Sequence, residues 1–207
     1  MRSSRGLALL AGFALAACSS SKYVEVAPRL DLRPVHAIGL VTFTTVNARE
    51  SMGEQATRRF AEQVLGAQSG IEVLEIEPSD SLLRYAADKG YGPDFAQAVG
   101  RDKDVAAVFV GQLEVTGTRP AGVIESVRHM KVGATVSATL TVKLLSTKSG
   151  AAMWQGSSTA TEKVGEFALS RGTPSISARD PDDAYKAALS RLVDEVTSDM
   201  RPTWRKE

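Results

Sequence analysis

Cysteine and histidine are scarce in this chain, and their scarcity excludes several kinds of functional site. The 207 residues contain one cysteine, Cys18, and two histidines, His36 and His129. One cysteine forms no disulfide within the chain, and two isolated histidines do not make up a zinc ligand set. The sequence also has no G-x-S-x-G nucleophile motif and no glycine-rich phosphate loop after a strand. We therefore expect no catalytic residue, no metal site and no bound cofactor, which predicts a protein that is not an enzyme.

A strong charge of one sign is missing as well. The formal net charge is +1, from 25 Lys and Arg against 24 Asp and Glu. Domains that bind nucleic acid are usually strongly basic, so we expect no nucleic acid as a partner. Long hydrophobic runs are also missing, because no segment beyond the N-terminus has the roughly 20 apolar residues that a membrane helix requires.

The N-terminus, in contrast, has the pattern of a secreted protein. Arg2 and Arg5 precede a short apolar run, which is typical of a signal peptide over residues 1–17. The last three residues of that segment then lead directly into Cys18, as in a bacterial lipobox: they are Leu15, Ala16 and Ala17.

In a lipobox the cysteine thiol receives diacylglycerol, the signal peptide is cut just before the cysteine, and the new amine is acylated. We therefore expect Cys18 to carry a covalent diacylglycerol and acyl chain, which together anchor the protein to a membrane. Ser19 follows the cysteine in place of the Asp that commonly retains lipoproteins at the inner membrane. This favours the outer membrane, at its periplasmic face.

The remaining chain predicts one domain between two less regular segments. Residues 18–34 comprise the acylated cysteine and a stretch of Ser, Pro and charged residues without a period, which predicts a flexible tether. Residues 35–200 are expected to form a single α/β domain, and residues 201–207 a C-terminal tail.

Hydrophobic periodicity predicts the order of elements in that domain. Residues 132–144 alternate between apolar and small or polar residues, which is the clearest strand pattern in the chain. Helices are predicted near 51–70, with Ser51 as the N-cap, near 81–90 and 93–100, and over 180–200; strands are predicted over 35–43, 71–76, 105–116, 132–144 and after the turn at 146–150. This order predicts an α/β sandwich: a mixed sheet with an antiparallel meander in its second half, and helices packed on it.

Two stretches carry a family resemblance. PDFAQAVGRDKDVAAVFVGQLEV, residues 93–115, and ATVSATLTVKLLSTKSGAAMWQGS, residues 134–157, resemble recurrent segments of the CsgG-like superfamily. This is the group around the curli-secretion lipoprotein, and it includes an activator of a peptidoglycan synthase. The resemblance covers about residues 35–200 and implies an anticodon-binding-domain-like α/β sandwich.

In the secretion lipoprotein, insertions on either side of the alternating strand form membrane hairpins of a pore shared by many subunits. The corresponding segments here are residues 117–131 and 162–179. The first is too short for two strands of roughly 9–11 residues and a turn. The second is interrupted by Lys163, Glu166, Arg171 and Pro174. We therefore expect loops rather than hairpins, which argues against a pore.

Several residues are candidates for a partner surface. Arg119, Arg128 and Lys131 form a candidate basic patch. Trp154 and Trp204 are candidate interface aromatics, although a core position for Trp154 and a disordered tail around Trp204 remain open alternatives.

The resulting expectation is an outer-membrane-anchored periplasmic lipoprotein that acts as a non-catalytic adaptor in cell-envelope assembly or secretion. Its expected partners are the membrane, through the lipid anchor, and periplasmic envelope proteins. One alternative is an oligomeric CsgG-like secretion channel component, in which the partner is a further copy of this chain. Another is an envelope hydrolase, which requires an active-site cluster that the sequence does not contain.

Overall fold

A computed structural model describes residues 23–76, 90–126, 129–170, 173–178 and 181–206. Its elements are β1 (Tyr23–Val26), η1 (Arg33–Val35), β2 (Ala37–Val41), β3 (Thr44–Val46), α1 (Glu50–Ala67), β4 (Glu72–Ile76), α3 (Pro93–Lys103), β5 (Ala107–Ser126), β6 (His129–Ser146), β7 (Ala152–Ser170), β8 (Thr173–Ala178), α4 (Pro181–Val196), η2 (Ser198–Met200) and β9 (Thr203–Lys206). The predicted helix near residues 81–90, the signal peptide, the lipobox and Cys18 all lie outside the described residues.

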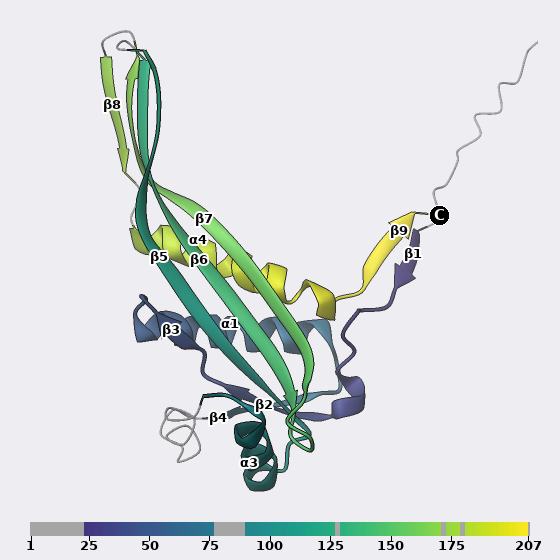
Figure 1. Cartoon of the computed structure of the whole chain (residues 1–207). Coiled ribbons are helices and arrows are strands. Elements are labelled where there is room, and N and C mark those ends of the chain that lie inside the picture. Colours follow the sequence, from purple (N-terminus) through teal and green to yellow (C-terminus); the bar gives the residue numbers. More distant parts are fainter. Residues whose placement is uncertain (1–22, 77–89, 127–128, 171–172, 179–180, 207) are drawn as a thin grey trace, which may run out of the picture.

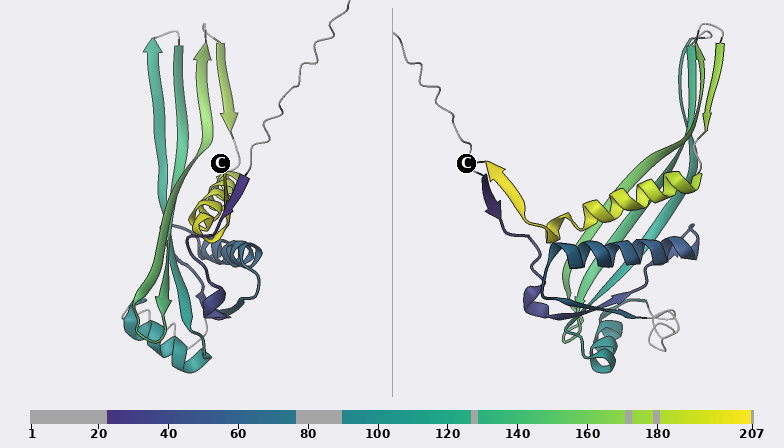
Figure 2. Two further views of the ribbon diagram at one scale, coloured as in Figure 1. Left: turned by 90° about the vertical axis from the view of Figure 1, so that its right-hand side faces the viewer. Right: turned by 180° about the vertical axis from the view of Figure 1, so that it is seen from behind.

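The main sheet is mixed, as the sequence predicts. Its strand order is β4-β2-β5-β6-β7-β8, and β3 pairs with β5 beside β2. Strand β2 runs parallel to β4 and β5, whereas β5 to β8 form a consecutive antiparallel meander. Helices α1 and α4 pack on one face of this sheet (Figures 1 and 2). The predicted fold class is therefore confirmed.

The core lies between the sheet and these two helices. In α1, Ala56, Phe60 and Val64 recur every four residues and are all buried. The Phe60 ring meets Phe43 and Phe109 edge to face, at centroid distances of 5.3 and 5.0 Å. A second, smaller cluster forms where α3 packs on the opposite face of β5. The helix α1 begins at Glu50, so the expectation of Ser51 as its N-cap is wrong.

The largest difference from the sequence prediction concerns the two segments expected to be loops. Strand β5 is 20 residues long, β6 is 18 and β7 is 19, so both segments are hairpin strands. The expectation of loops is wrong because it counts only the residues inside each segment. The hairpin strands are instead continuations of the core strands, so they also include residues that were assigned to the meander.

The two chain ends also differ from expectation. Tyr23–Val26 and Thr203–Lys206 pair as an antiparallel ribbon, and Leu32 is fully buried in the core. The tether therefore does not extend to residue 34, and the C-terminal tail is not disordered over β9. No helix in the described ranges is long and apolar enough to cross a membrane.

Candidate functional site: a sheet extension and a terminal arm

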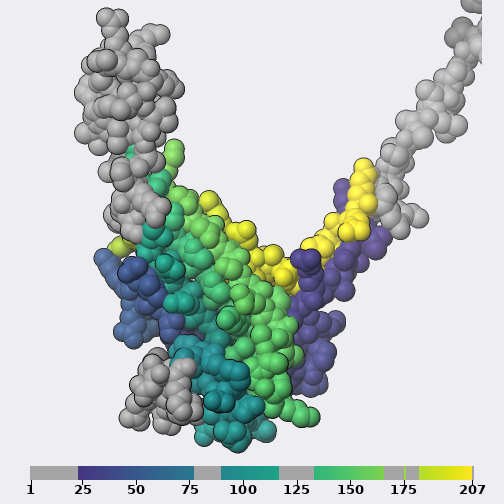
Figure 3. Space-filling model, in the orientation of Figure 1, coloured from purple at the N-terminus to yellow at the C-terminus, as the bar shows by residue number. Residues whose placement is uncertain are grey.

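Two features project from the α/β body. The first, here called the extension, comprises residues 117–126 of β5, 129–135 of β6, 163–170 of β7, and β8. These strands continue the sheet beyond the ends of α1 and α4 (Figures 1 and 2). The second, here called the arm, is the ribbon of β1 and β9, which stands out from the body in Figure 3.

The strand register gives the extension one wholly apolar face. Residues paired across antiparallel strands share a face, and successive rows alternate between the two faces. Three alternate rows on one face are Pro120, Ala134, Gly165 and Ala178; Gly122, Val132, Phe167 and Ile176; and Ile124, Met130, Leu169 and Pro174. Every position in these rows is apolar, so we call this the apolar face.

The intervening rows contain small and polar residues and one larger apolar residue, Val123. They are Arg119, Thr135 and Lys163; Ala121, Gly133, Glu166 and Ser177; and Val123, Lys131, Ala168 and Ser175. Arg119 and Lys131 of the predicted basic patch therefore lie on the same face of the sheet, opposite the apolar rows. Arg128 lies outside the described residues, and a partner for this patch stays a prediction.

Both faces continue from the body. On β6, the apolar rows are in phase with Val136, Ala138 and Leu140, which are buried in the body. Glu162 marks the end of the helix cover, because its carboxylate lies 3.0 Å from the Arg191 guanidinium of α4. Beyond that point, the apolar face continues past both helices.

The polar face is a ladder of hydroxyl groups in the body. Three cross-strand pairs of hydroxyls lie within hydrogen-bond distance: Ser137 and Thr161 at 2.8 Å, Thr139 and Thr159 at 3.0 Å, and Thr141 and Ser157 at 3.0 Å. This face has no cover from α1 or α4, which pack on the other side of the sheet. By its register the extension is therefore amphipathic across its thickness: one face is apolar in sequence on strands that continue past α1 and α4, and the other continues the exposed hydroxyl face of the body.

The extension also has two open edges. Strand β5 pairs with β2 at residues 107–109 and with β3 at residues 112–114. Within the described ranges, the outer edge of β5 beyond Glu114 has no strand partner, and β8 pairs with β7 alone. Open edges present backbone donors and acceptors to solvent or to another strand.

The arm concentrates exposed hydrophobic residues. Its register pairs Tyr23 with Lys206, Val24 with Arg205, Glu25 with Trp204 and Val26 with Thr203. All eight residues are exposed. Tyr23 and Trp204 fall in alternate rows and therefore share a face, and their exposed fractions are 63% and 64%.

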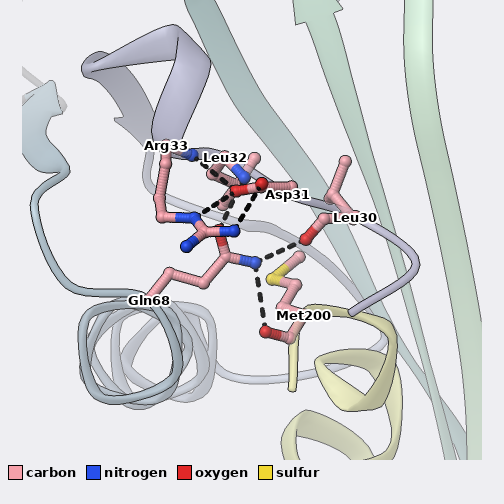
Figure 4. A network of polar contacts seen from close by, with 6 residues as sticks. All are labelled: Leu30, Asp31, Leu32, Arg33, Gln68 and Met200. Carbon is pink, nitrogen blue, oxygen red and sulfur yellow. Dashed lines mark hydrogen bonds and ion pairs between the residues drawn. The ribbon is translucent and has the colours of Figure 1, made fainter. Parts of the chain in front are cut away.

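The arm joins the body through residues 30–32 and 199–200, here called the root, and a buried amide holds these two segments together (Figure 4). The Gln68 side chain is only 4% exposed. Its Oε1 accepts a hydrogen bond from the Leu32 N–H at 2.6 Å, and its Nε2 donates to the carbonyls of Met200, at 3.0 Å, and Leu30. The end of α1 thus holds the segment after β1 and the segment before β9 together.

Further contacts support the same root. The Leu30 N–H donates to the Asp199 carbonyl at 2.9 Å, and the Trp154 Nε1–H donates to the Asp199 carboxylate at 3.3 Å. Beside them, hydrogen bonds from Arg33 lower the pKa of Asp31. Trp154 is partly buried against the core and meets Phe109 edge to face at 6.3 Å. This geometry favours the core alternative for Trp154, whereas Trp204 is exposed.

A groove of about 460 Å³ lies at the foot of the extension, between α1 and α4. It is lined by Met52, Val115 and Tyr185 among others, and Arg49 and Asp182 form an ion pair of 3.4 Å beside it. In the described part of the chain, no group of three His, Cys, Asp or Glu residues is placed to hold a metal ion. His36 is exposed at the end of η1, and His129 begins β6.

No family model and no curated protein matches this chain. Solved structures do match in fold. The PelC dodecamer from Paraburkholderia phytofirmans is 17% identical and covers 86% of this chain and 96% of its own, with a TM-score of 0.43. The lipoprotein GNA1162 from Neisseria meningitidis is 14% identical over 61% of this chain and 83% of its own, with a TM-score of 0.43.

A third similar structure is a neuraminyllactose-binding hemagglutinin homolog from Helicobacter pylori, at 13% identity, 80% and 83% coverage, and a TM-score of 0.47. At these identities and TM-scores, the likenesses indicate nothing about the activity of this chain. Membership of the CsgG-like superfamily stays a prediction, because no family model matches.

Proposed function

We propose that this chain is a lipid-anchored lipoprotein of the outer membrane, facing the periplasm, and that it acts without catalysis as a subunit of an oligomeric envelope assembly. The observation that carries this proposal is the extension, in which a wholly apolar face lies between two open strand edges. Its finer form is a CsgG-like secretion channel component, as the family resemblance implies.

Water is a poor environment for such a sheet. Contiguous exposed apolar positions usually mark an interaction surface, and open edges invite strand addition. Pairing the β5 edge of one copy with the β8 edge of the next satisfies both edges through one repeated contact. A repeated head-to-tail contact of this kind closes into a ring when its rotation allows it. If the apolar face meets lipid, this pairing is required, because unpaired backbone groups in hydrocarbon cost several kcal/mol each.

The second candidate function is a tethered adaptor, and two observations favour it. From position 120 to position 124 the apolar rows extend about 14 Å along a strand, roughly half of the hydrocarbon core of a bilayer. Pro120 and Pro174 also lie on the two edge strands, where each removes one backbone donor and disfavours strand addition. In this alternative, the apolar face docks on a partner protein of the envelope.

Oligomeric mass separates the two candidates. We would extract the full-length acylated protein in mild detergent and measure its mass by native mass spectrometry. A closed ring of many subunits supports the assembly proposal. A monomer or dimer rejects it in favour of the adaptor, and crosslinking to periplasmic proteins is then the next step.

Two neighbouring positions on β7 provide a matched test of the apolar face. Phe167 lies in an apolar row and Ala168 in a polar row, opposite Lys131. We expect Phe167→Glu to abolish the high-mass species, because it places a charge on the face that assembly buries. Ala168→Glu adds the same charge on the other face and should preserve that species. Equal behaviour of the two variants in the native mass measurement would contradict the role of the apolar face.

A further inference from the structure

Among the residues whose side-chain exposure the structure describes, which leave out most of the extension, the arm is the densest group of exposed hydrophobic residues. Of the seven large hydrophobic residues that are exposed in this set, four belong to the arm: Tyr23, Val24, Val26 and Trp204. A two-stranded ribbon by itself is marginally stable in water, and none of the arm residues is buried against the body. A surface that covers the arm would therefore account for its composition.

Chain length places that surface close to the lipid anchor. Four residues, 19–22, separate Cys18 from Tyr23. Five Cα–Cα steps of 3.8 Å reach at most about 19 Å, so an acylated Cys18 keeps the start of β1 within that distance of the membrane. This step rests on the lipid anchoring of Cys18, which is part of the proposed function.

The chemistry of the arm fits the headgroup layer of a bilayer. Tyr and Trp side chains favour the membrane interface, where an apolar ring and a polar atom are both accommodated. Lys206 shares a face with Tyr23 and Trp204, and Arg205 lies on the other face beside Val24. Basic residues near the surface of an anionic membrane are attracted to its phosphates. Glu25, the single acidic residue of the two strands, pairs with Trp204 and lies on the same face as Tyr23 and Lys206.

We propose that the arm docks in the headgroup layer of an anionic phospholipid membrane, with the face that carries Tyr23 and Trp204 against the lipid. The root at Gln68 holds the arm on the body, so docking also sets the orientation of the body. The free end of the arm and the strands of the extension project from the same side of the molecule (Figures 1 and 2). A docked arm therefore turns the extension toward the same membrane.

Tryptophan fluorescence tests this contact, because Trp154 and Trp204 are the only two tryptophans in the sequence. The acylated full-length Trp154→Phe protein, in vesicles of phosphatidylethanolamine and phosphatidylglycerol, reports Trp204 alone. We expect brominated lipid chains to reduce its emission about twofold or more, because an interfacial Trp lies within reach of the chains. The Trp204→Phe protein reports Trp154, whose indole N–H is hydrogen-bonded to Asp199, and its emission should not be quenched. The quenching of the unmodified protein minus that of the Trp204→Phe protein also gives the signal of Trp204, with Trp154 left in the core.

Charge provides an independent readout. Replacing Arg205 and Lys206 with Gln should lower the equilibrium constant for binding of the arm to the anionic vesicle surface. The expected decrease is about fivefold per cation, which is about 1 kcal/mol each. Vesicles of phosphatidylcholine alone should show the same weakening for the unmodified protein.

The intact mass of the protein distinguishes failure of arm docking from failure of the lipid anchor. An acylated protein whose Trp204 emission is unquenched in anionic vesicles overturns arm docking while the lipid anchor stands. A protein purified from the envelope without an acyl mass overturns the anchor, and arm docking falls with it.

Discussion

At the scale of single residues, Gln68 is the clearest example of a polar group with a structural role. It is buried at the end of α1, and both ends of its amide are hydrogen-bonded to backbone groups of other segments. Buried polar groups in proteins are nearly always satisfied in this way. The consequence is that one side chain joins two segments that are distant in sequence, around Leu32 and Met200.

We expect Gln68→Met to lower the free energy of unfolding by about 2 to 3 kcal/mol. Methionine has a similar shape but leaves the Leu32 N–H and the Met200 carbonyl without this partner, and an unsatisfied buried group costs about 1–3 kcal/mol. Urea denaturation followed by circular dichroism measures the change. Gln55→Met on the exposed side of the same helix is the control and should stay within about 0.5 kcal/mol of the unmodified protein. A loss of similar size in both variants would contradict the role of the amide.

At the scale of elements, α1 fits against the sheet through a glycine. A Cβ atom added at Gly53 would collide with the Phe43 carbonyl oxygen and would lie 2.9 Å from Thr45 Cγ2. Thr57 reinforces this contact, because its hydroxyl donates to the Gly53 carbonyl and accepts a hydrogen bond from the Phe43 N–H, both at 2.8 Å. The start of the helix is therefore held close to the segment that follows β2.

Two alanine substitutions in α1 should consequently have opposite signs. Gly→Ala in a helix interior ordinarily stabilises by about 0.5–1 kcal/mol. We expect Gly66→Ala to show this gain, because nothing lies within 4 Å of the added Cβ. Gly53→Ala should instead destabilise by about 1–3 kcal/mol, because the backbone it meets cannot rotate away as a side chain would. Thermal denaturation of both variants measures the signs, and a stabilised Gly53→Ala protein would show that this packing is not tight.

The elements also show what periodicity can and cannot predict. The faces of α1 and β6 are readable because each repeats over one segment: Phe60 and Val64 on the helix, and Val136 to Leu144 on the strand. A single glycine inside a strand pattern indicates a bulge or a close approach, and at Gly111 of β5 an added Cβ would meet the Phe43 ring at 2.5 Å. In the turn predicted at 146–150, Gly150 has a φ of +74°.

The extension was missed because its pattern is distributed over four strands. Gly117, Pro120 and Gly122 give β5 the composition of a loop, and Pro174 does the same for β8. Both prolines lie on edge strands, where a missing N–H is tolerated, so they do not exclude a sheet. The apolar face becomes visible only when the register aligns residues from all four strands. The arm was missed for a similar reason, because its two strands come from opposite ends of the chain.

At the scale of the whole molecule, the body accounts for folding and the arm for docking. The body contains the two buried clusters, whereas the arm consists of exposed residues joined to the body at the root. The root itself belongs to the folded body, because Met200 is fully buried and its carbonyl accepts a hydrogen bond from Gln68. The boundary between the two parts therefore falls between Met200 and Thr203.

Two truncations on either side of this boundary should behave differently. A chain that ends at Pro202 lacks β9 alone, and we expect its free energy of unfolding to stay within about 0.5 kcal/mol, because only exposed residues are removed. A chain that ends at Ser198 also lacks Asp199 and Met200, and it should lose at least about 3 kcal/mol through the cavity left by Met200 and the lost bonds to Gln68 and Trp154. Each kcal/mol corresponds to a shift of about 2–4 °C in the melting temperature of a chain of this size, so circular dichroism resolves the difference. A large loss in the shorter truncation would mean that β9 stabilises the body, and the arm would then be part of the fold rather than a separate docking element.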